Sequence, residues 1–158
     1  MVETLSGDFI VRPGSRFALV VAEFNSFITA KLAEGAVECI LRHGGKESQI
    51  TQVKVPGAFE IPTVAKALAA SGKYAAVICL GCVIRGQTDH YDHVTRQVST
   101  GVGAIGPETG VPTMFGVITA DTIEQALDRA GLKAGNIGWH AAAAAIATVS
   151  VLGKIKGE

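Results

Sequence analysis

Four stretches rich in apolar and β-branched residues recur along the chain, at residues 17–22, 50–55, 75–84 and 113–119. In the first and third stretches the apolar residues are continuous rather than alternating, which is typical of strands covered on both faces. Between and after these stretches, apolar residues recur every three or four positions, which predicts helices. The helical segments cover residues 28–40, 61–70, 90–105 and 138–152, with a short one that begins at residue 121 or 122.

The alternation of strands and helices indicates the architecture. Repeated four times, it predicts right-handed βαβ units and hence a parallel sheet with helices on both faces. We therefore expect a single α/β domain over residues 1–158. Residues 9–11 are a short extra apolar stretch, which predicts a strand able to pair with another chain, within an N-terminal arm of residues 1–12. If Asp121 caps the fourth helix, Glu124 stands where a capping box requires it.

The overall composition narrows the classes of partner. The chain has 158 residues, with 14 Lys and Arg against 14 Asp and Glu, and it is 48% hydrophobic and 18% charged. This composition excludes a disordered chain. A neutral balance without a basic run argues against nucleic acid or an anionic membrane as the main partner. High apolarity on a small chain indicates that other subunits cover part of the surface.

The cysteines and the N-terminus favour a cytoplasmic protein. Cys39, Cys79 and Cys82 are odd in number and form no repeated Cys-x-x-Cys pair, which argues against disulfide and zinc frameworks. Glu3 and Asp8 stand where a signal peptide requires a basic start and an apolar run. The longest apolar stretch is too short to span a bilayer.

The loop after the third apolar stretch holds the most reactive side chains. Ligands of parallel α/β sheets bind beyond the carboxyl ends of the strands, where this loop is expected to lie. Gly86, Gln87 and Thr88 stand between a strand and a helix, where free backbone N–H groups favour an anion such as phosphate. His90 follows at the first helical turn, either as a general acid and base or as a capping or surface group.

A metal site is the less favoured interpretation of the same segment. His90 and His93 share one helix face, as metal ligands often do. Only one carboxylate, that of Asp92, lies between them in the sequence, and no third His or Cys is placed to join them. We therefore expect no metal.

Other side chains near the strand ends allow a structural and a functional interpretation. Glu60 either interacts with a helix dipole or accepts hydrogen bonds from substrate hydroxyls. Arg129, late in the fourth helix, either stabilises the helix C-terminus or reaches a phosphate, whose geometry its planar guanidinium matches. Phe24 and Phe115 are either core and interface residues or platforms on which a ring stacks.

Seven motifs occur in an order and with a spacing that identify one family. They are residues 23–25 (Glu-Phe-Asn), 55–62 (Val-Pro-Gly-Ala-Phe-Glu-Ile-Pro), 80–92, 112–119, 121–126, 129–131 (Arg-Ala-Gly) and 133–136 (Lys-Ala-Gly-Asn). The series resembles the lumazine synthases (6,7-dimethyl-8-ribityllumazine synthases), transferases of riboflavin biosynthesis. The resemblance covers essentially the whole chain.

The resemblance implies a fold, an assembly and a reaction. The fold is a flavodoxin-like three-layer αβα sandwich with a four-stranded parallel sheet, and the subunits assemble as pentamers or as an icosahedral shell of 60. The reaction condenses 5-amino-6-(ribitylamino)uracil with 3,4-dihydroxy-2-butanone 4-phosphate, with loss of phosphate and water. It implies no metal and no organic cofactor, because the site supplies orientation and proton transfer.

The resemblance also implies which side chains bind ribitylaminouracil. Phe24 stacks on its pyrimidine, and six others hold its ribityl chain (Ala58, Phe59 and Glu60) or line its ring pocket (Cys82, Val83 and Ile84).

For the second substrate, the resemblance implies that the backbone of Gln87 and Thr88 holds the phosphate. His90 moves the proton. Phe115 and Arg129 come from the neighbouring subunit, and Arg129 pairs with the phosphate.

The chain departs from the family pattern near its end. Ile137 stands where a Lys is usual beside the substrate, and His140 replaces an acid assigned to proton relay. Glu23 stands where Arg is common. The last helix contains five consecutive Ala, from residue 141 to 145, and little charge, which is unusual for a solvated helix.

These departures leave two hypotheses. The first is a working lumazine synthase with reduced activity, since His90, Arg129 and the loop of residues 86–88 expected to bind phosphate are present. The second is an assembly scaffold of the same fold, natural or redesigned, in which catalysis is weakened or lost. A generic phosphate- or flavin-binding module of this fold explains the architecture but not the series of motifs.

Overall fold

The computed structural model describes residues 1–133 and 135–158. Within these residues four parallel strands form one sheet in the order β2–β1–β3–β4. The strands are β1 (Phe17–Ala22), β2 (Ile50–Val55), β3 (Ala76–Ile84) and β4 (Thr113–Ala120). The four predicted strands are confirmed, and each observed end lies within one residue of the predicted one.

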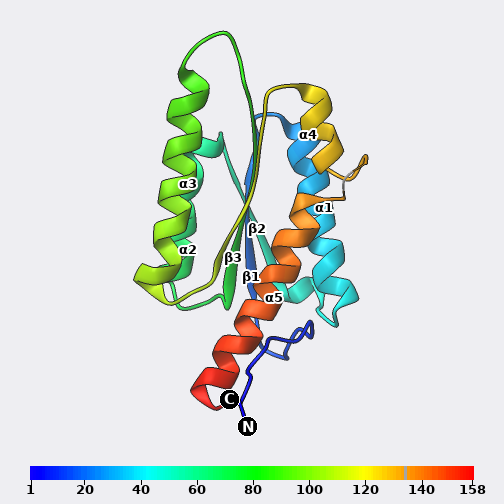
Figure 1. Ribbon diagram of the computed structural model, residues 1–158, viewed down its shortest axis with the longest axis vertical. Helices are drawn as coiled ribbons and strands as arrows, with labels where there is room; N and C mark the ends of the chain where they lie inside the picture. The colour runs from blue at the N-terminus through cyan, green and yellow to red at the C-terminus, as the bar shows by residue number, and fades with distance from the viewer. Residues whose placement is uncertain (134) are drawn as a thin grey trace.

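The helices cover both faces of the sheet and complete three layers (Figure 1). One face packs against α1 (Ser26–Arg42), α4 (Ile123–Arg129) and α5 (Ile137–Lys156), and the other against α2 (Ile61–Ala70) and α3 (His90–Thr109). Two 3₁₀ turns, η1 (Glu47–Gln49) and η2 (Ala58–Glu60), flank β2. The strand order is that of the flavodoxin-like fold without a fifth strand, so the predicted fold class is confirmed.

The continuous apolar runs of β1 and β3 follow from this burial on both faces. Leu19 and Ile78 point into the core under α1 and α5, whereas Val20 and Val77 point into the core under α2 and α3. All four side chains are fully buried. Side chains of adjacent positions in a strand face opposite layers, and here both layers are helices.

The cap predicted for the fourth helix at Asp121 is wrong, and the alternative at Thr122 is confirmed. The Thr122 hydroxyl oxygen accepts a hydrogen bond from the Gln125 N–H at 3.2 Å, and its backbone is extended as an N-cap requires. The Asp121 carboxylate instead accepts a hydrogen bond from the side chain of Arg85 at 2.9 Å. The predicted capping box with Glu124 is therefore not formed.

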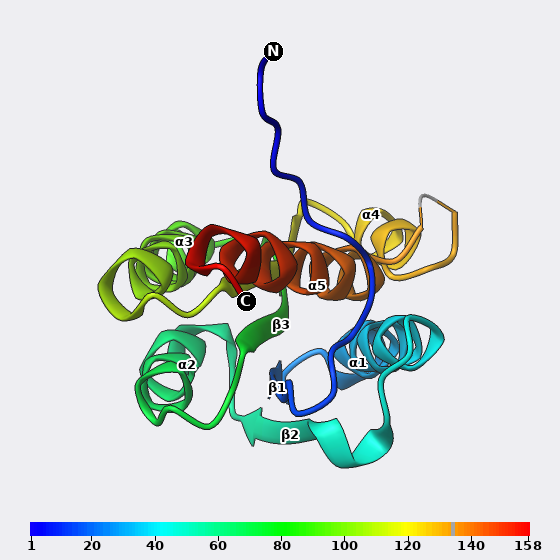
Figure 2. The ribbon, with the colours of Figure 1, turned by 90° about the horizontal axis from the view of Figure 1, so that it is seen from below.

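Within this single chain residues 9–11 form no strand, and their predicted pairing with another chain stays a prediction. Residues 9–11 run as irregular backbone, with one link from the Val11 N–H to the carbonyl oxygen of His43 at 2.9 Å. A strand requires the free edge of another strand, and within one chain the arm lies over helix α5 rather than beside such an edge (Figure 2). Figure 2 shows the arm crossing α5, with its first residues extending away from the body of the protein.

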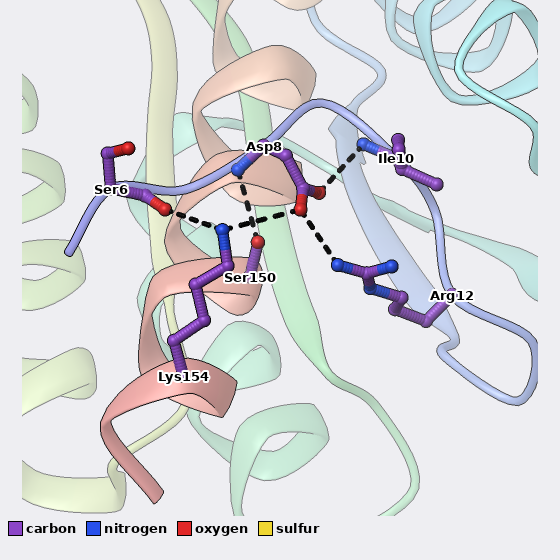
Figure 3. Close-up of polar contacts among 6 residues, drawn as sticks. All are labelled: Ser6, Asp8, Ile10, Arg12, Ser150 and Lys154. Carbon is purple, nitrogen blue, oxygen red and sulfur yellow. Dashed lines mark hydrogen bonds and ion pairs between the residues drawn. The ribbon is translucent and has the colours of Figure 1, made fainter. Parts of the chain in front are cut away.

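Polar contacts fasten the arm to α5 (Figure 3). The Asp8 N–H donates to the Ser150 hydroxyl oxygen at 3.1 Å, and the Asp8 carboxylate lies 2.8 Å from Arg12 and 3.5 Å from Lys154. Lys154 also donates to the carbonyl oxygen of Ser6 at 2.8 Å. Asp8 is therefore the centre of the contacts that hold the arm.

The alanine-rich helix α5 packs closely on its own chain. By length and composition α5 could cross a membrane, with a mean hydropathy of 1.2, but it lies against α1 and β4 and part of it is buried. Ala141, Ala142 and Ala145 face the core. A Cβ on Gly116 of β4 would lie only 3.2 Å from the Cβ of Ala141, so larger side chains on this face of α5 would force the helix away.

Candidate active site

A cleft of about 520 Å³ opens at the carboxyl ends of β1, β2 and β3. Its position agrees with the rule that open α/β sheets bind ligands where the strand order reverses, here between β1 and β3. The lining, called the first cleft below, consists of Phe24, Asn25, Pro56, Gly57, Ala58, Phe59, Glu60, Cys82, Val83, Ile84, His90, Tyr91 and Val94. Eight of the twelve predicted site residues therefore lie together.

Hydrogen bonds from the segment after β1 to the segments after β2 and at the end of β3 fix the position of Phe24. The next residue, Asn25, adopts the left-handed conformation with φ 60°, and its side-chain amide donates to the Cys82 carbonyl oxygen at 2.9 Å. The Phe24 N–H donates to the carbonyl oxygen of Pro56 at 3.0 Å. These two hydrogen bonds fix the backbone around Phe24, and the residue is 72% exposed, so its ring is available for stacking.

The turn after β2 presents Phe59 and Glu60. Ala58 is buried below them, whereas the side chains of Phe59 and Glu60 are exposed. Glu60 stands at the N-cap of α2, but its carboxylate makes no capping hydrogen bond. Its oxygens are therefore available to accept hydrogen bonds from a bound molecule, besides any interaction with the helix dipole.

The end of β3 forms the apolar wall of the first cleft. Cys82 and Val83 are buried, and Ile84 is half-buried. Burial raises the pKa of the Cys82 thiol from its usual 9.0 to about 11. At neutral pH Cys82 is therefore a neutral thiol that contributes apolar surface and no nucleophile.

His90 is the first residue of α3 and belongs to the lining of the first cleft. Its imidazole is exposed, and its backbone N–H donates to the Thr88 hydroxyl oxygen at 3.4 Å. Gln87 and Thr88 lie just before it in an exposed loop and are not part of the cleft lining. Across residues 1–133 and 135–158, no group of three His, Cys, Asp or Glu side chains is placed to hold a metal ion.

Phe115 and Arg129 lie in a different cleft of the same chain. This second cleft, of about 970 Å³, runs along the edge strand β4 between α4 and α5. It is lined by Phe115, Val117, Ile118, Thr119, Ala120, Gln125, Asp128, Arg129, Lys133 and Ile137. Of the residues that the structure describes, none lines both clefts, so a single chain does not bring Arg129 to His90.

The two departures from the family pattern are separated in space. Ile137 lines the second cleft beside Arg129, whereas His140 lines a shallow groove between α1 and α5 with Glu34 and Trp139. Of the two, the structure therefore places only Ile137 in either cleft.

Sequence reasoning missed several residues that line the clefts. Asn25 joins the loop after β1 to the Cys82 carbonyl oxygen, and its signal was an amide side chain three residues after a buried strand. Tyr91 follows His90 and lines the first cleft, and Lys133 adds a second cation to the second cleft. Both belong to motifs that identify the family, but neither residue was assigned a role in the site.

Comparison with known proteins assigns the chain to a family. The sequence profile of the 6,7-dimethyl-8-ribityllumazine synthases matches residues 14–153. The chain is 55% identical to a 6,7-dimethyl-8-ribityllumazine synthase of Prosthecochloris aestuarii over 150 residues, which cover 95% of this chain and 96% of the relative. Family membership agrees with the strand order and with the cleft at the switch point. The chain belongs to the 6,7-dimethyl-8-ribityllumazine synthase family.

Proposed function

We propose that this protein condenses 5-amino-6-(ribitylamino)uracil with 3,4-dihydroxy-2-butanone 4-phosphate to form 6,7-dimethyl-8-ribityllumazine. The 5-amino group of the uracil joins the four-carbon substrate with loss of one water, the phosphate leaves by elimination, and the ribitylamino nitrogen closes the second ring with loss of another water. The substrates react with each other directly, so the protein has to align them and to move protons. The assembly scaffold is less favoured, because 55% identity to a synthase extends over 95% of the chain.

One observation carries the proposal. The first cleft gathers side chains from three segments that are far apart in the sequence, residues 24–25, 56–60 and 82–94. Together they offer exposed aromatic rings, a carboxylate, an apolar wall and an imidazole, which are the groups that a pyrimidine with a polyol chain requires.

Each group has a proposed role toward ribitylaminouracil. The ring of Phe24 stacks on the pyrimidine, and Glu60 accepts hydrogen bonds from the ribityl hydroxyls beside Ala58 and Phe59. Residues 82–84 enclose the ring, since an apolar wall excludes water from the reacting atoms.

The second substrate lies toward α3 in this proposal. The backbone N–H groups of Gln87 and Thr88 bind its phosphate just before the N-terminus of α3, where the helix dipole favours an anion. His90 takes and returns the proton. Phe115 and Arg129 of a neighbouring subunit complete the site, and the guanidinium neutralises the phosphate.

This arrangement requires an oligomer. We infer a homo-oligomer in the cytoplasm, either a pentamer or a shell of 60 subunits, in which the second cleft of one subunit faces the first cleft of the next. Its support is the separation of His90 from Arg129 within one chain and the exposed aromatic ring of Phe115, which is 44% accessible.

Turnover of the two substrates, followed by the absorbance of the lumazine, tests the proposal. His90→Asn should lower kcat by roughly 10²–10⁴-fold, the usual contribution of a general acid and base. His93→Asn is the matched control, because His93 is exposed on the same helix and does not line the first cleft. We expect it to retain the activity of the unchanged protein.

Two results would contradict the proposal. No turnover by the unchanged protein at any substrate concentration would favour the scaffold hypothesis. Equal losses in His90→Asn and His93→Asn would show that His90 has no special part in the reaction.

A further inference from the structure

A cluster of charged side chains at the ends of β3 and β4 is not explained by either cleft. Its centre is Arg85, which directly follows β3 and lines neither cleft. The Arg85 Nε donates to the Asp121 carboxylate at 2.9 Å, and its Nη1 lies 3.7 Å from the Asp92 carboxylate. The guanidinium carbon lies 4.2 Å from the centre of the Tyr91 ring.

These contacts fix both ends of the phosphate loop, residues 86–89. Arg85 precedes the loop, and Tyr91 and Asp92 belong to the first turn of α3 that follows it. The backbone adds a further link, because the Arg85 N–H donates to the carbonyl oxygen of Ala120 at 2.8 Å. A loop held at both ends has less conformational freedom to lose when it binds an anion.

The surroundings of Arg85 do not suit a direct phosphate ligand. Two carboxylates face its guanidinium, and the Tyr91 ring covers one of its faces. The hydrogen bond to Asp121 is the main reason that the pKa of Arg85 is raised above its usual value. An additional anion at this position would meet the charges of Asp92 and Asp121.

The same cluster also reaches the second cleft. The Asp121 N–H donates to the side-chain oxygen of Gln125 at 2.9 Å, and Gln125 lines the second cleft with Arg129. The ion pair therefore connects the loop before His90 to the beginning of α4, which carries Arg129.

We propose that Arg85 is a positioning residue, which holds the phosphate loop and His90 in place through Asp121 and Tyr91. The inference rests on the proposed function, since it concerns the loop assigned there to phosphate. It predicts that the loop is preorganised before the substrate arrives. Lys cannot replace Arg85, because its ammonium cannot both bond Asp121 edge-on and lie flat on Tyr91.

Steady-state kinetics with each substrate varied in turn test this role. Arg85→Lys should raise the KM for the butanone phosphate by about tenfold and change the KM for ribitylaminouracil by less than about twofold. Arg16→Lys is the matched control, since Arg16 bonds Thr51 at 3.2 Å and lies 5.6 Å from the ring of Tyr74, away from both clefts. It should leave both KM values unchanged.

A double-mutant cycle with Asp121→Asn separates positioning from direct contact. If Arg85 acts through Asp121, Arg85→Gln combined with Asp121→Asn should be no worse than Arg85→Gln alone. Fully additive losses would show that Arg85 acts independently of Asp121 and would overturn the proposal.

Hydrogen exchange measured by mass spectrometry gives a readout without turnover. The amides of residues 86–89 should exchange faster in Arg85→Lys than in the unchanged protein, whereas Arg16→Lys should match it. Unchanged exchange in Arg85→Lys would overturn the proposal. Faster exchange in a protein that shows no turnover in any form would support the positioning role and refute the proposed function.

Discussion

Ile137 brings an apolar side chain into the second cleft, where the family pattern has an ammonium. It lies there with Arg129, Lys133 and Asp128. Replacing Ile137 with Lys would restore a cation beside the substrate, and Asp128 would offset part of the repulsion from the two existing cations. We expect Ile137→Lys to raise kcat/KM by about tenfold, the usual effect of one added charged hydrogen bond.

His140 supplies the control for that prediction. It lines the groove between α1 and α5 rather than either cleft, so His140→Glu should leave kcat/KM within about twofold of the unchanged protein. Steady-state kinetics of both variants check the pair. A gain from His140→Glu and none from Ile137→Lys would mean that the assembled site differs from the arrangement of clefts in one chain.

Cys82 carries a prediction about pH. Its thiol ionises near 9.0 when exposed, and burial raises that pKa to about 11 in the folded protein. The stabilisation from keeping the thiol neutral is complete below pH 9 and is lost as the pH rises toward 11. Urea unfolding at stepped pH should show the unchanged protein losing stability over this range, and Cys82→Ala losing less of it. A parallel decline in both would contradict this assignment.

At the scale of the element, the apolar pattern was sufficient to predict the position and ends of a strand wherever helices cover both of its faces. The strands β1 and β3 read as continuous apolar runs because helices cover both sides, and their predicted ends agree with the structure to one residue. The helix α2 was predicted over its full length, since Gly72 stops its stripe. Phe24, Glu60 and His90 stand in segments that follow strands of one parallel sheet. The rule that such segments meet at the carboxyl edge of the sheet was therefore enough to predict that they lie together.

Local pattern failed where a distant partner decides the structure. Asp121 looked like an N-cap, but its carboxylate bonds Arg85, which is 36 positions away in the sequence. Residues 9–11 form no strand within one chain, where Ser150 and Lys154, near the other end of the chain, hold the arm on α5. Neither partner is visible in a window of ten residues.

The arm itself gives a prediction at this scale. Desolvation works to raise the pKa of Asp8, but the charges of Arg12 and Lys154, with hydrogen bonds from Ile10 and Ser150, lower it below its ordinary value of 3.8. The ion pairs are therefore present at neutral pH and are lost as the pH falls below 3.8. Asp8→Asn should free the arm at pH 7, and hydrogen exchange of residues 1–12 should then be faster.

The control for the arm is Glu38→Gln. Glu38 forms an exposed ion pair with Arg42 on α1, a turn apart on the same helix, and this pair does not involve the arm. Exchange of residues 1–12 should be unchanged in this variant. Equal exchange in Asp8→Asn and the unchanged protein would show that the contacts of Val11 and the packing of residues 7–12 hold the arm without Asp8.

At the scale of the whole molecule, the separation of the two clefts allows a test of whether each active site is formed by two subunits. His90 lies in the first cleft and Arg129 in the second, so each active site in the proposed oligomer combines the first cleft of one subunit with the second cleft of another. Such an interface is heterologous, since two different surfaces of the same chain meet.

Complementation between two inactive variants follows from this geometry. Oligomers of His90→Asn alone or of Arg129→Ala alone have a defect in every site. In oligomers co-expressed from equal amounts of both, about one quarter of the sites combine an intact first cleft with an intact second cleft, because each half is intact in half of the subunits. We expect activity to return to about that fraction, measured on assemblies purified by size. Activity no higher than the mean of the two separate variants would place Arg129 and His90 in sites built from one chain, or Arg129 outside the site.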